Sequence, residues 1–390
     1  MVLAATRIRR PAIGCGRAKA SAGVARQTAY IDVAAISAIN EYHRLVALDR
    51  LYLDHAATTP MVPQAKAAMV EAMDRWANPS SPHAEGRAAR AALEDARSRI
   101  AAALGWGGHV LFTSGASEAI AIGLTRAKAA RILTSPVEHD SVLRVTSTAQ
   151  RLQVSPDGTV APGCAGYGDG TVLAIQHVNN ETGVIQPLDR LERDAAILFA
   201  DCAQSAGKLP LPDADMIAIS AHKFGGSPGT GALLVRDLAL LQPSGGQEQG
   251  YRAGTENLPA ILAMVAALEH RPDWLPAAAI LRDRLDRAIE EAGGEVVARG
   301  ARRSPAIASY RMPGVSARAQ LIQFDLAGIS VSAGSACSSG SLKTSHVLHA
   351  MGWDDAAAGE VIRVSFGPST SDADVDRFLE QWLKMASKRP

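Results

Sequence analysis

Short apolar runs alternate with helical stretches along the chain from Leu51 onward. This alternation is typical of a mostly parallel β-sheet whose faces are covered by helices. The sequence therefore predicts an α/β fold built around one large sheet. Its strands are expected at residues 110–113, 132–134, 172–175, 197–199, 217–219 and 231–235.

A smaller α/β domain is expected to follow the large one. A long amphipathic stretch at 277–292 precedes a strand-like stretch at 306–310. We place the large domain at 51–256 and the small domain, which carries a cysteine-containing loop, at 257–390. Residues 51–64 are assigned to the large domain but could instead pack on the small domain. A cleft is expected between the two domains.

Residues 1–50 form a basic extension of different composition. Six arginine and lysine residues occur before the first acidic residue, Asp32. An arginine-rich segment that is poor in acidic residues is compatible with an organelle transit peptide. A disordered or mis-started leader is the alternative that we favour, because composition alone defines such segments weakly.

The overall composition excludes several classes of partner. The formal net charge is +1, and no stripe of basic residues interleaved with aromatic ones predicts direct nucleic-acid binding. The longest apolar stretches, such as 262–268, fall short of the roughly 18 to 20 residues that a membrane span needs. The four cysteines, at positions 15, 164, 202 and 337, lack the C-x-x-C spacing of a zinc site and predict no metal site or disulfide framework. A reducing cytoplasm is the expected location.

Lys223 is placed where an amine can take part in chemistry. It follows the apolar run 216–219, and Asp201 and Gln204 follow another apolar run at 195–200. In open α/β sheets, ligands bind outside the carboxyl ends of the strands. We therefore expect these polar groups to meet at one sheet edge, where an amine suggests Schiff-base chemistry.

The stretch 114–118 joins a predicted strand to a helical stretch at 118–129. The free N–H groups of a helix start, together with the Ser117 hydroxyl, form an anion site suited to a phosphate. The alternative is that Ser117 is an ordinary N-cap preceded by a turn glycine. The stretch taken alone favours the N-cap.

Other polar residues near the strand ends each have a functional and a structural interpretation. Asp201 could pair with a protonated pyridine nitrogen or cap a neighbouring helix. Gln204 could reach a phenolic oxygen or be a surface amide. His139 could stack on an aromatic cofactor and move protons, or be a packed or capping histidine. The asparagine-rich stretch 179–183 could be a turn, a contact to substrate, or both.

Two more residues stand out in the second half of the chain. Cys337 lies in a run of small residues, Ser335–Gly340, which predicts an exposed loop able to carry a nucleophile to a cofactor and away. Cys202, in contrast, is expected to be a packed small residue. Arg363 lies among apolar neighbours, so it either binds a substrate carboxylate or belongs to a buried ion pair.

Nine motifs occur in a characteristic order between Leu51 and Lys384. They occupy residues 52–60, 78–83, 113–118, 177–183, 201–208, 220–223, 252–257, 334–337 and 362–367. Together they resemble the pyridoxal-phosphate-dependent cysteine desulfurases of the iron–sulfur-assembly type, in the class V aminotransferase family. The resemblance implies the type I fold of aspartate aminotransferase, with a large and a small α/β domain.

The resemblance also assigns roles to single residues. Lys223 would hold pyridoxal 5'-phosphate covalently, His139 would stack on its ring, Asp201 would pair with its nitrogen, and Gln204 would contact its oxygen. Its phosphate would be bound by Ala116, Ser117, Ser220 and His222, joined by Thr255 from the other subunit of a homodimer. Asn180, which would also contact the cofactor, and Arg363 would hold the substrate carboxylate.

The implied reaction converts L-cysteine to L-alanine and leaves the sulfur on Cys337 as a persulfide. Lys223, His139 and Cys337 would be the catalytic residues. The sulfur would then pass to an acceptor or scaffold protein for iron–sulfur clusters or another sulfur-transfer pathway. Two alternatives stay open: a sister enzyme, such as a selenocysteine lyase or an aminotransferase, and a catalytically silent partner of a sulfur-transfer complex.

Overall fold

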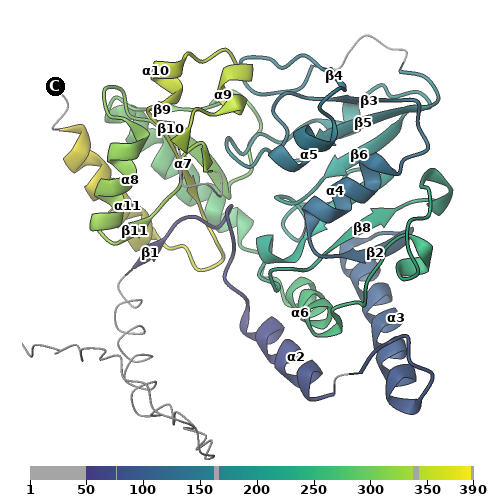
Figure 1. Ribbon diagram of the computed structural model, residues 1–390. Coiled ribbons are helices and arrows are strands. Elements are labelled where there is room, and N and C mark those ends of the chain that lie inside the picture. Colours follow the sequence, from purple (N-terminus) through teal and green to yellow (C-terminus); the bar gives the residue numbers. More distant parts are fainter. Residues whose placement is uncertain (1–49, 76, 162–166, 337–341, 388–390) are drawn as a thin grey trace, which may run out of the picture. The chain divides into compact units, whose positions relative to one another are not determined.

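The computed structural model describes residues 50–75, 77–161, 167–336 and 342–387. Residues 50–390 form one compact unit (Figure 1). The predicted basic extension lies outside the described residues except for Arg50.

A seven-stranded sheet is the centre of the first part of this unit, as the apolar runs predicted. Its strands are β2 (His109–Thr113), β3 (Arg131–Thr134), β4 (Gln150–Arg151), β5 (Thr171–Gln176), β6 (Ile197–Asp201), β7 (Met216–Ser220) and β8 (Gly231–Val235). Their order is β2-β8-β7-β6-β5-β3-β4. The pairs from β7 to β4 are parallel, whereas β8 runs antiparallel to both of its neighbours. The sheet is therefore mostly parallel.

Helices cover both faces of this sheet (Figure 1). On one face α2 (Pro63–Asp74), α3 (Ala84–Leu104) and α6 (Leu258–Glu269) share a hydrophobic core with the sheet. On the other face α4 (Ala116–Thr125) and α5 (Asp140–Val145) do the same. Successive strand residues join opposite cores, as the alternation of side chains along a strand requires. In β2, for example, Val110 and Phe112 face the core that contains α2, α3 and α6, which we call the first core, and Leu111 faces the side covered by α4 and α5.

A second core lies in the part of the chain from α7 onward. The elements here are α7 (Leu275–Glu291), β9 (Glu295–Val296), β10 (Ile307–Arg311), α8 (Ala317–Leu326), β11 (Ile329–Ser330), β12 (Ser335–Ala336), β13 (Leu342–Lys343), α9 (His346–Ala350), α10 (Asp355–Ala358), β14 (Val361–Ser365) and α11 (Asp372–Ala386). β14, β10 and β9 form an antiparallel sheet. The stacked rings of Phe324 and Phe378, with centroids 4.8 Å apart, and the fully buried Trp382 fill the space between its helices.

The chain connects these two cores at its beginning. β1 (Leu51–Tyr52) pairs in parallel with β11, and Leu51 and Leu53 belong to the second core. Helix α6 packs against α2 and α3 and belongs to the first core. The point in the chain at which residues stop packing in the first core and begin to pack in the second therefore lies nearer to α7 than to residue 257. The domain boundary that we placed at 256–257 stays a prediction.

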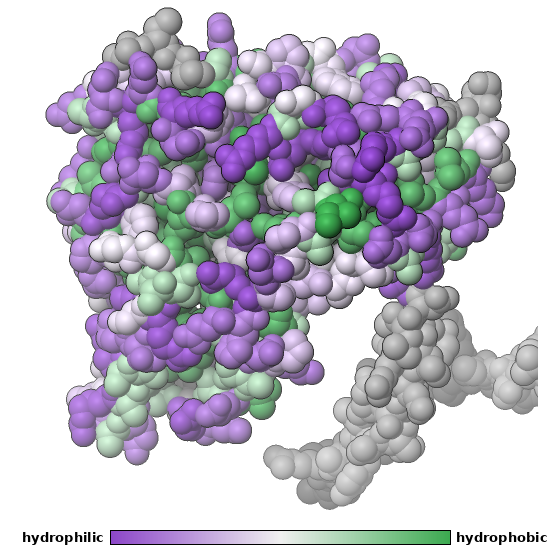
Figure 2. All heavy atoms as spheres, turned by 180° about the vertical axis from the view of Figure 1, so that it is seen from behind, coloured by the Kyte–Doolittle hydropathy of each residue, from purple (hydrophilic) through white to green (hydrophobic). Residues whose placement is uncertain are grey.

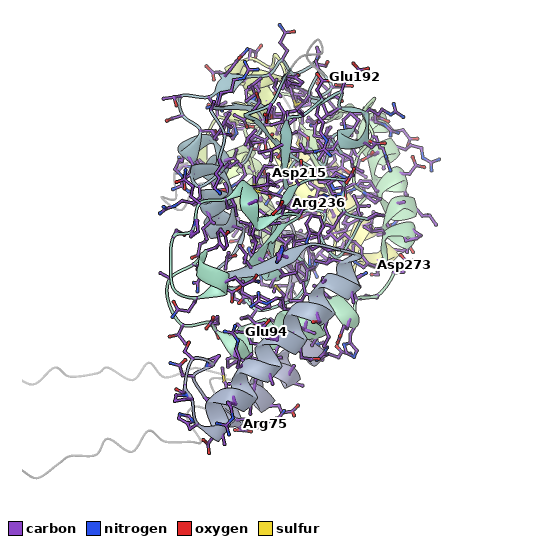
Figure 3. All side chains as sticks on the ribbon, turned by 90° about the vertical axis from the view of Figure 1, so that its right-hand side faces the viewer. Arg75, Glu94, Glu192, Asp215, Arg236 and Asp273 are labelled. Carbon is purple, nitrogen blue, oxygen red and sulfur yellow. The ribbon has the colours of Figure 1, made fainter. Side chains whose placement is uncertain are left out.

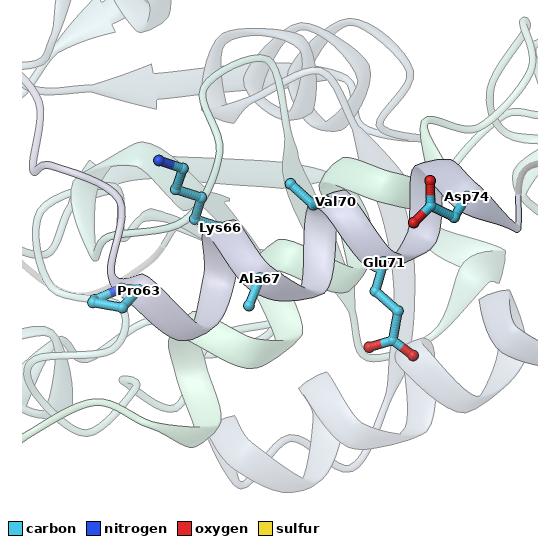
Figure 4. A pocket seen from close by; sticks show the side chains of 6 residues that line it. All are labelled: Pro63, Lys66, Ala67, Val70, Glu71 and Asp74. Carbon is cyan, nitrogen blue, oxygen red and sulfur yellow. The ribbon is translucent and has the colours of Figure 1, made fainter.

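The surface of the described part carries ion pairs and a hollow on one helix. Arg236, just after β8, forms ion pairs with Asp213 at 2.5 Å and with Asp215, just before β7, at 4.0 Å (Figure 3). The outer face of α2 has an open hollow lined by Pro63, Lys66, Ala67, Val70, Glu71 and Asp74 (Figure 4). Seen from behind, the surface is mostly hydrophilic, with hydrophobic residues in scattered patches (Figure 2). No helix among the described residues is long and apolar enough to cross a membrane.

Candidate active site

A cavity of about 680 Å³ opens at the carboxyl ends of the parallel strands. The last residues of β5, β6 and β7, which are Gln176, Asp201 and Ser220, all line it. The second part of the chain contributes further lining residues: Ser332, Gly334, His346 and Arg363. The strand ends thus meet where the topology of an open α/β sheet places ligands.

Most residues that the sequence singled out lie in this cavity. They are Ala116, Ser117, His139, Asn180, Asp201, Gln204, Ser220, His222, Lys223 and Arg363. Thr255 is exposed and is not among the lining residues. Cys337 lies outside the described residues, but the strands on either side of its loop, β12 and β13, pair as a hairpin.

The Lys223 amine is held by main-chain carbonyls from a distant part of the chain. It lies in the short 3-10 turn Ala221–Lys223 that follows β7. Its Nζ donates to the carbonyl oxygens of Ala56 and Ala57 at 2.7 and 2.8 Å. Burial and the nearby Arg363 guanidinium lower the pKa of Lys223 from 10.5 to about 8. A much larger fraction of this amine than of an exposed lysine is therefore neutral, and so nucleophilic, near neutral pH.

Asp201 and Gln204 present buried polar atoms at the end of β6. Asp201 is 6% exposed, and its Oδ1 accepts the N–H of Ala203 at 2.9 Å. Burial raises the pKa of this carboxyl, so a cationic neighbour would favour its ionised form. Gln204 is 5% exposed, so our alternative of a surface amide is wrong. Its Nε2 donates to the Ala56 carbonyl at 2.8 Å, and its buried Oε1 has no hydrogen-bond partner among the described residues.

The N-terminus of α4 opens onto the cavity through Ser114, Gly115, Ala116 and Ser117. Gly115, not Ser117, is the N-cap, with φ at 148° and no side-chain cap. The structure therefore corrects the N-cap interpretation of Ser117, whose hydroxyl is available for other contacts. The first N–H groups of a helix lack partners within the helix, so this end favours an anion.

Three histidines among the described residues line the cavity, and two of them, His139 and His222, are mainly neutral. His139 is the N-cap of α5, where its Nδ1 accepts the N–H of Ser141 at 3.2 Å, so the capping interpretation is correct. Burial lowers the pKa of His139, against the opposing effect of the Asp201 carboxylate. Burial and the Lys223 charge lower the pKa of His222 to about 4. A neutral imidazole has one donor and one acceptor nitrogen, which suits both binding and proton transfer.

Arg363 is fixed from two directions at the edge of the cavity. Its Nη2 donates to Asp54 Oδ1 at 2.8 Å, and its Nη1 donates to the Asn180 carbonyl at 2.9 Å. The ion-pair interpretation of Arg363 is therefore correct. Because a guanidinium carries five N–H donors, these two contacts leave donors for a further carboxylate. Asn179 meanwhile closes the turn, its Oδ1 accepting the N–H groups of Glu181 and Thr182.

Sequence reasoning missed several residues around the cavity. Glu138 is fully buried, and burial raises its pKa to about 8. It accepts hydrogen bonds from the Ser135 hydroxyl at 2.6 Å and the Gln176 N–H at 2.8 Å. Glu138 could have been found from its position next to His139 in the sequence. Asp54, the partner of Arg363, was also missed and could have been found from the motif at 52–60. His346 had no such signal.

Comparisons with known proteins identify the family. The aminotransferase class V family model matches residues 51–378. A cysteine desulfurase of Cereibacter sphaeroides is 35% identical over 85% of this chain and 95% of its own length. The cysteine desulfurase IscS of Dictyoglomus turgidum is 35% identical over 87% of this chain and 95% of its own length. The chain belongs to the cysteine desulfurases of the class V aminotransferase family.

A solved structure supports the same family. The NifS-like protein from Rickettsia africae superposes with a TM-score of 0.79 at 28% identity, and the match covers 87% of this chain and 99% of that protein. The predicted family, the type I α/β fold class and the enzyme class are therefore confirmed.

Proposed function

We propose that the chain releases sulfur from L-cysteine with bound pyridoxal 5'-phosphate and leaves it on Cys337 as a persulfide. The single observation that carries this proposal is the cavity, in which a partly neutral lysine, a buried carboxyl and an arginine fork line one space. These are the groups that an aldehyde cofactor and an amino acid substrate need.

The residues present fit the cofactor. Among the described residues the buried Oε1 of Gln204 has no hydrogen-bond partner, and the buried Asp201 carboxyl, although its Oδ1 accepts the Ala203 N–H, would gain from a cationic counterpart because burial disfavours its charged form. A phenolic O–H that donates a hydrogen bond to the amide oxygen and a protonated ring nitrogen beside the carboxyl would supply those counterparts. The N-terminus of α4, with Ala116, Ser117, Ser220 and His222 beside it, would hold the phosphate. Lys223 would bind the aldehyde carbon, and His139 would face the ring.

The bound cofactor would supply an electron sink for the substrate carbanion. The protein's own groups would do the rest. Arg363 and Asn180 would hold the substrate carboxylate, and the Lys223 amine would move the proton of the substrate's α-carbon.

The transfer of sulfur from the substrate to Cys337 needs no further oxidant or reductant. The Cys337 thiolate forms an S–S bond with the substrate sulfur as the substrate C–S bond breaks. The electron pair of that bond stays with the carbon, which takes up a proton. The products are L-alanine and the Cys337 persulfide.

We further propose that the enzyme is a homodimer that works in the cytoplasm and passes its sulfur to an acceptor or scaffold protein, as in iron–sulfur cluster assembly. The position of Thr255 supports a dimer. This residue is exposed and lies outside the cavity lining of its own chain, so it is able to serve the site of a second copy.

The decisive test measures alanine released from L-cysteine in the presence of a reductant. Wild type should release alanine and, in a single turnover without the reductant, gain the mass of one sulfur atom at Cys337, whereas Cys337→Ala should do neither. Cys202→Ala is the matched control, because this thiol is fully buried and should not affect sulfur transfer. Alanine release by Cys337→Ala at the wild-type rate would contradict the mechanism and favour a sister enzyme. No alanine from any variant would favour a silent partner.

A further inference from the structure

The turn between β3 and α5 is tied to the end of the neighbouring strand β5. This turn, residues 135–138, leads directly into His139, the N-cap of α5, and we call it the histidine turn. Its Val137 carbonyl accepts a hydrogen bond from Gln176 Nε2 at 2.6 Å and another from Asn179 Nδ2 at 3.0 Å. The main chain just before His139 is therefore fixed by two side chains from β5 and the loop after it.

Glu138 attaches the same turn through its side chain and its main chain. Its Oε2 accepts the main-chain N–H of Gln176 at 2.8 Å, and its Oε1 lies 2.6 Å from the Ser135 hydroxyl. Its carbonyl lies 2.9 Å from His346 Nε2. Glu138 thus connects the start of the turn, the end of β5 and α9, and it does so at the residue next to His139.

The Glu138 carboxyl is fully buried without a cation in contact. Among the described residues no cationic side chain forms an ion pair with it. Arg151 on β4 is exposed and donates to the Thr146 hydroxyl at 3.3 Å, so it acts on Glu138 only from a distance. An isolated buried carboxylate is so costly that the group takes up a proton instead. Burial, with a smaller contribution from the Asp201 carboxylate on β6, accordingly raises the pKa of Glu138 to about 8.

A protonated Glu138 suits both of its side-chain partners. The Gln176 N–H only donates, so Oε2 is an acceptor in either protonation state. The Ser135 hydroxyl both donates and accepts, so its contact with Oε1 also accommodates a proton on the carboxyl. The turn therefore keeps its attachments when Glu138 is neutral.

We propose that Glu138, as a neutral carboxylic acid, is a positioning residue that fixes the histidine turn and so holds His139 at the cavity. The inference rests on the proposed function, in which His139 faces the cofactor ring. The neutral form has a second consequence for the site. It sets no further negative charge beside the Asp201 carboxylate, and two neighbouring carboxylates disfavour each other's ionised form.

Two substitutions at Glu138 separate its hydrogen bonds from its charge. Glu138→Gln copies the neutral acid, because the amide oxygen accepts the Gln176 N–H and the amide NH2 donates to the Ser135 hydroxyl. Glu138→Met has a similar volume and loses both bonds. Glu248→Gln is the matched control, the same exchange at a buried carboxylate that does contact a cation, Arg97, at 2.8 Å.

The first measurement is the urea denaturation of the cofactor-free chain between pH 5 and pH 8. The folded pKa of Glu138 lies above its ordinary value of 4.5, so the folded wild type binds more protons than the unfolded chain in this window. Its unfolding free energy therefore falls as the pH rises. Glu138→Gln lacks this fall, so its urea midpoint should rise relative to wild type from pH 5 to pH 8. Glu248→Gln should show no such rise.

The second measurement is NMR of the cofactor-free chain with isotope-labelled histidine, in which the His139 signal is assigned from the spectrum of His139→Gln. At pH 7 the His139 ring signal should shift or broaden in Glu138→Met and stay at the wild-type position in Glu138→Gln. The signal of His270, the C-cap of α6 on the opposite face of the sheet, should not move in either variant. In the cofactor-loaded enzyme, Glu138→Met should release alanine about 10-fold more slowly, since a misplacement of about 1 Å can slow a reaction up to roughly 100-fold.

Two results would each overturn the inference. A urea midpoint of Glu138→Gln that does not rise relative to wild type would mean that Glu138 is ionised in the folded chain. An unmoved His139 signal in Glu138→Met would mean that the turn holds without this side chain. If Glu138→Met does not fold, Ser135→Ala removes one of the two side-chain bonds and answers the same NMR question. Both measurements use the cofactor-free chain, so they keep their meaning if wild type releases no alanine, a result that would refute the proposed function alone.

Discussion

Replacing Lys223 by methionine should change how the stability of the cofactor-free protein depends on pH. In the folded chain, burial lowers the pKa of this amine from 10.5 to about 8. Between these two values the unfolded chain binds more protons than the folded one. The linkage relation then requires that the free energy of unfolding rises with pH in this window. Lys223→Met lacks the amine and therefore lacks this rise.

The size of the effect follows from the two pKa values. One unit of pKa difference corresponds to about 1.4 kcal/mol, and most of the titration in this window falls between pH 7 and pH 10. Lys223 is only partly buried, so solvent reduces the effect. Relative to the variant, wild type should gain on the order of 2 kcal/mol of unfolding free energy from pH 7 to pH 10. The hydrogen bonds that methionine loses shift the variant by a similar amount at both pH values, so they largely cancel in this comparison.

Urea denaturation of both proteins at pH 7 and pH 10 measures this difference. Lys66→Met is the matched control, because Lys66 lies on the exposed face of α2 (Figure 4) and should not alter the pH dependence. A stability difference between wild type and Lys223→Met that stays constant over this range would refute the lowered pKa. The neutral amine that the cofactor aldehyde needs would then require another explanation.

Three further substitutions test the site and the fold. Arg363→Lys should raise the KM for L-cysteine about 10-fold or more with a smaller effect on kcat, because an ammonium group cannot reproduce the planar, two-pronged guanidinium. Alanine release at varied L-cysteine concentration measures this, and an unchanged KM would argue against carboxylate binding by Arg363. Arg97→Met should lower the unfolding free energy by about 3 kcal/mol, since it leaves the fully buried Glu248 carboxylate without the cation 2.8 Å away. Urea denaturation measures this change, and an unchanged stability would contradict the prediction. Gly183→Ala should cost on the order of 3 kcal/mol in the same assay, because φ is +77° and a Cβ would lie 2.3 Å from the Ile307 carbonyl oxygen; a stable variant would mean that the turn can relax.

The sequence predicted the strands of the large sheet because each strand is a local apolar run. All six expected strands are present with bounds that differ by at most two residues. The helix predicted at 277–292 is α7, Leu275–Glu291. The edge where Asp201, Ser220 and Lys223 meet was also predictable, since the carboxyl ends of parallel strands share one side of a sheet. These features depend on short segments of chain and on one general rule of topology.

Tertiary structure alone decided the contacts that tune the site. Arg363 and Asp54 are 309 positions apart, and Glu138 and Gln176 are 38 apart, so no local pattern relates them. The lowered pKa of Lys223 likewise arises from burial and from Arg363, which lies 140 positions later in the chain. The sequence by itself determined which chemical groups are available and on which strand ends they lie. Which of them touch, and how strongly each holds its proton, depended on packing between segments that are distant in the chain, because hydrogen bonds and desolvation act through space.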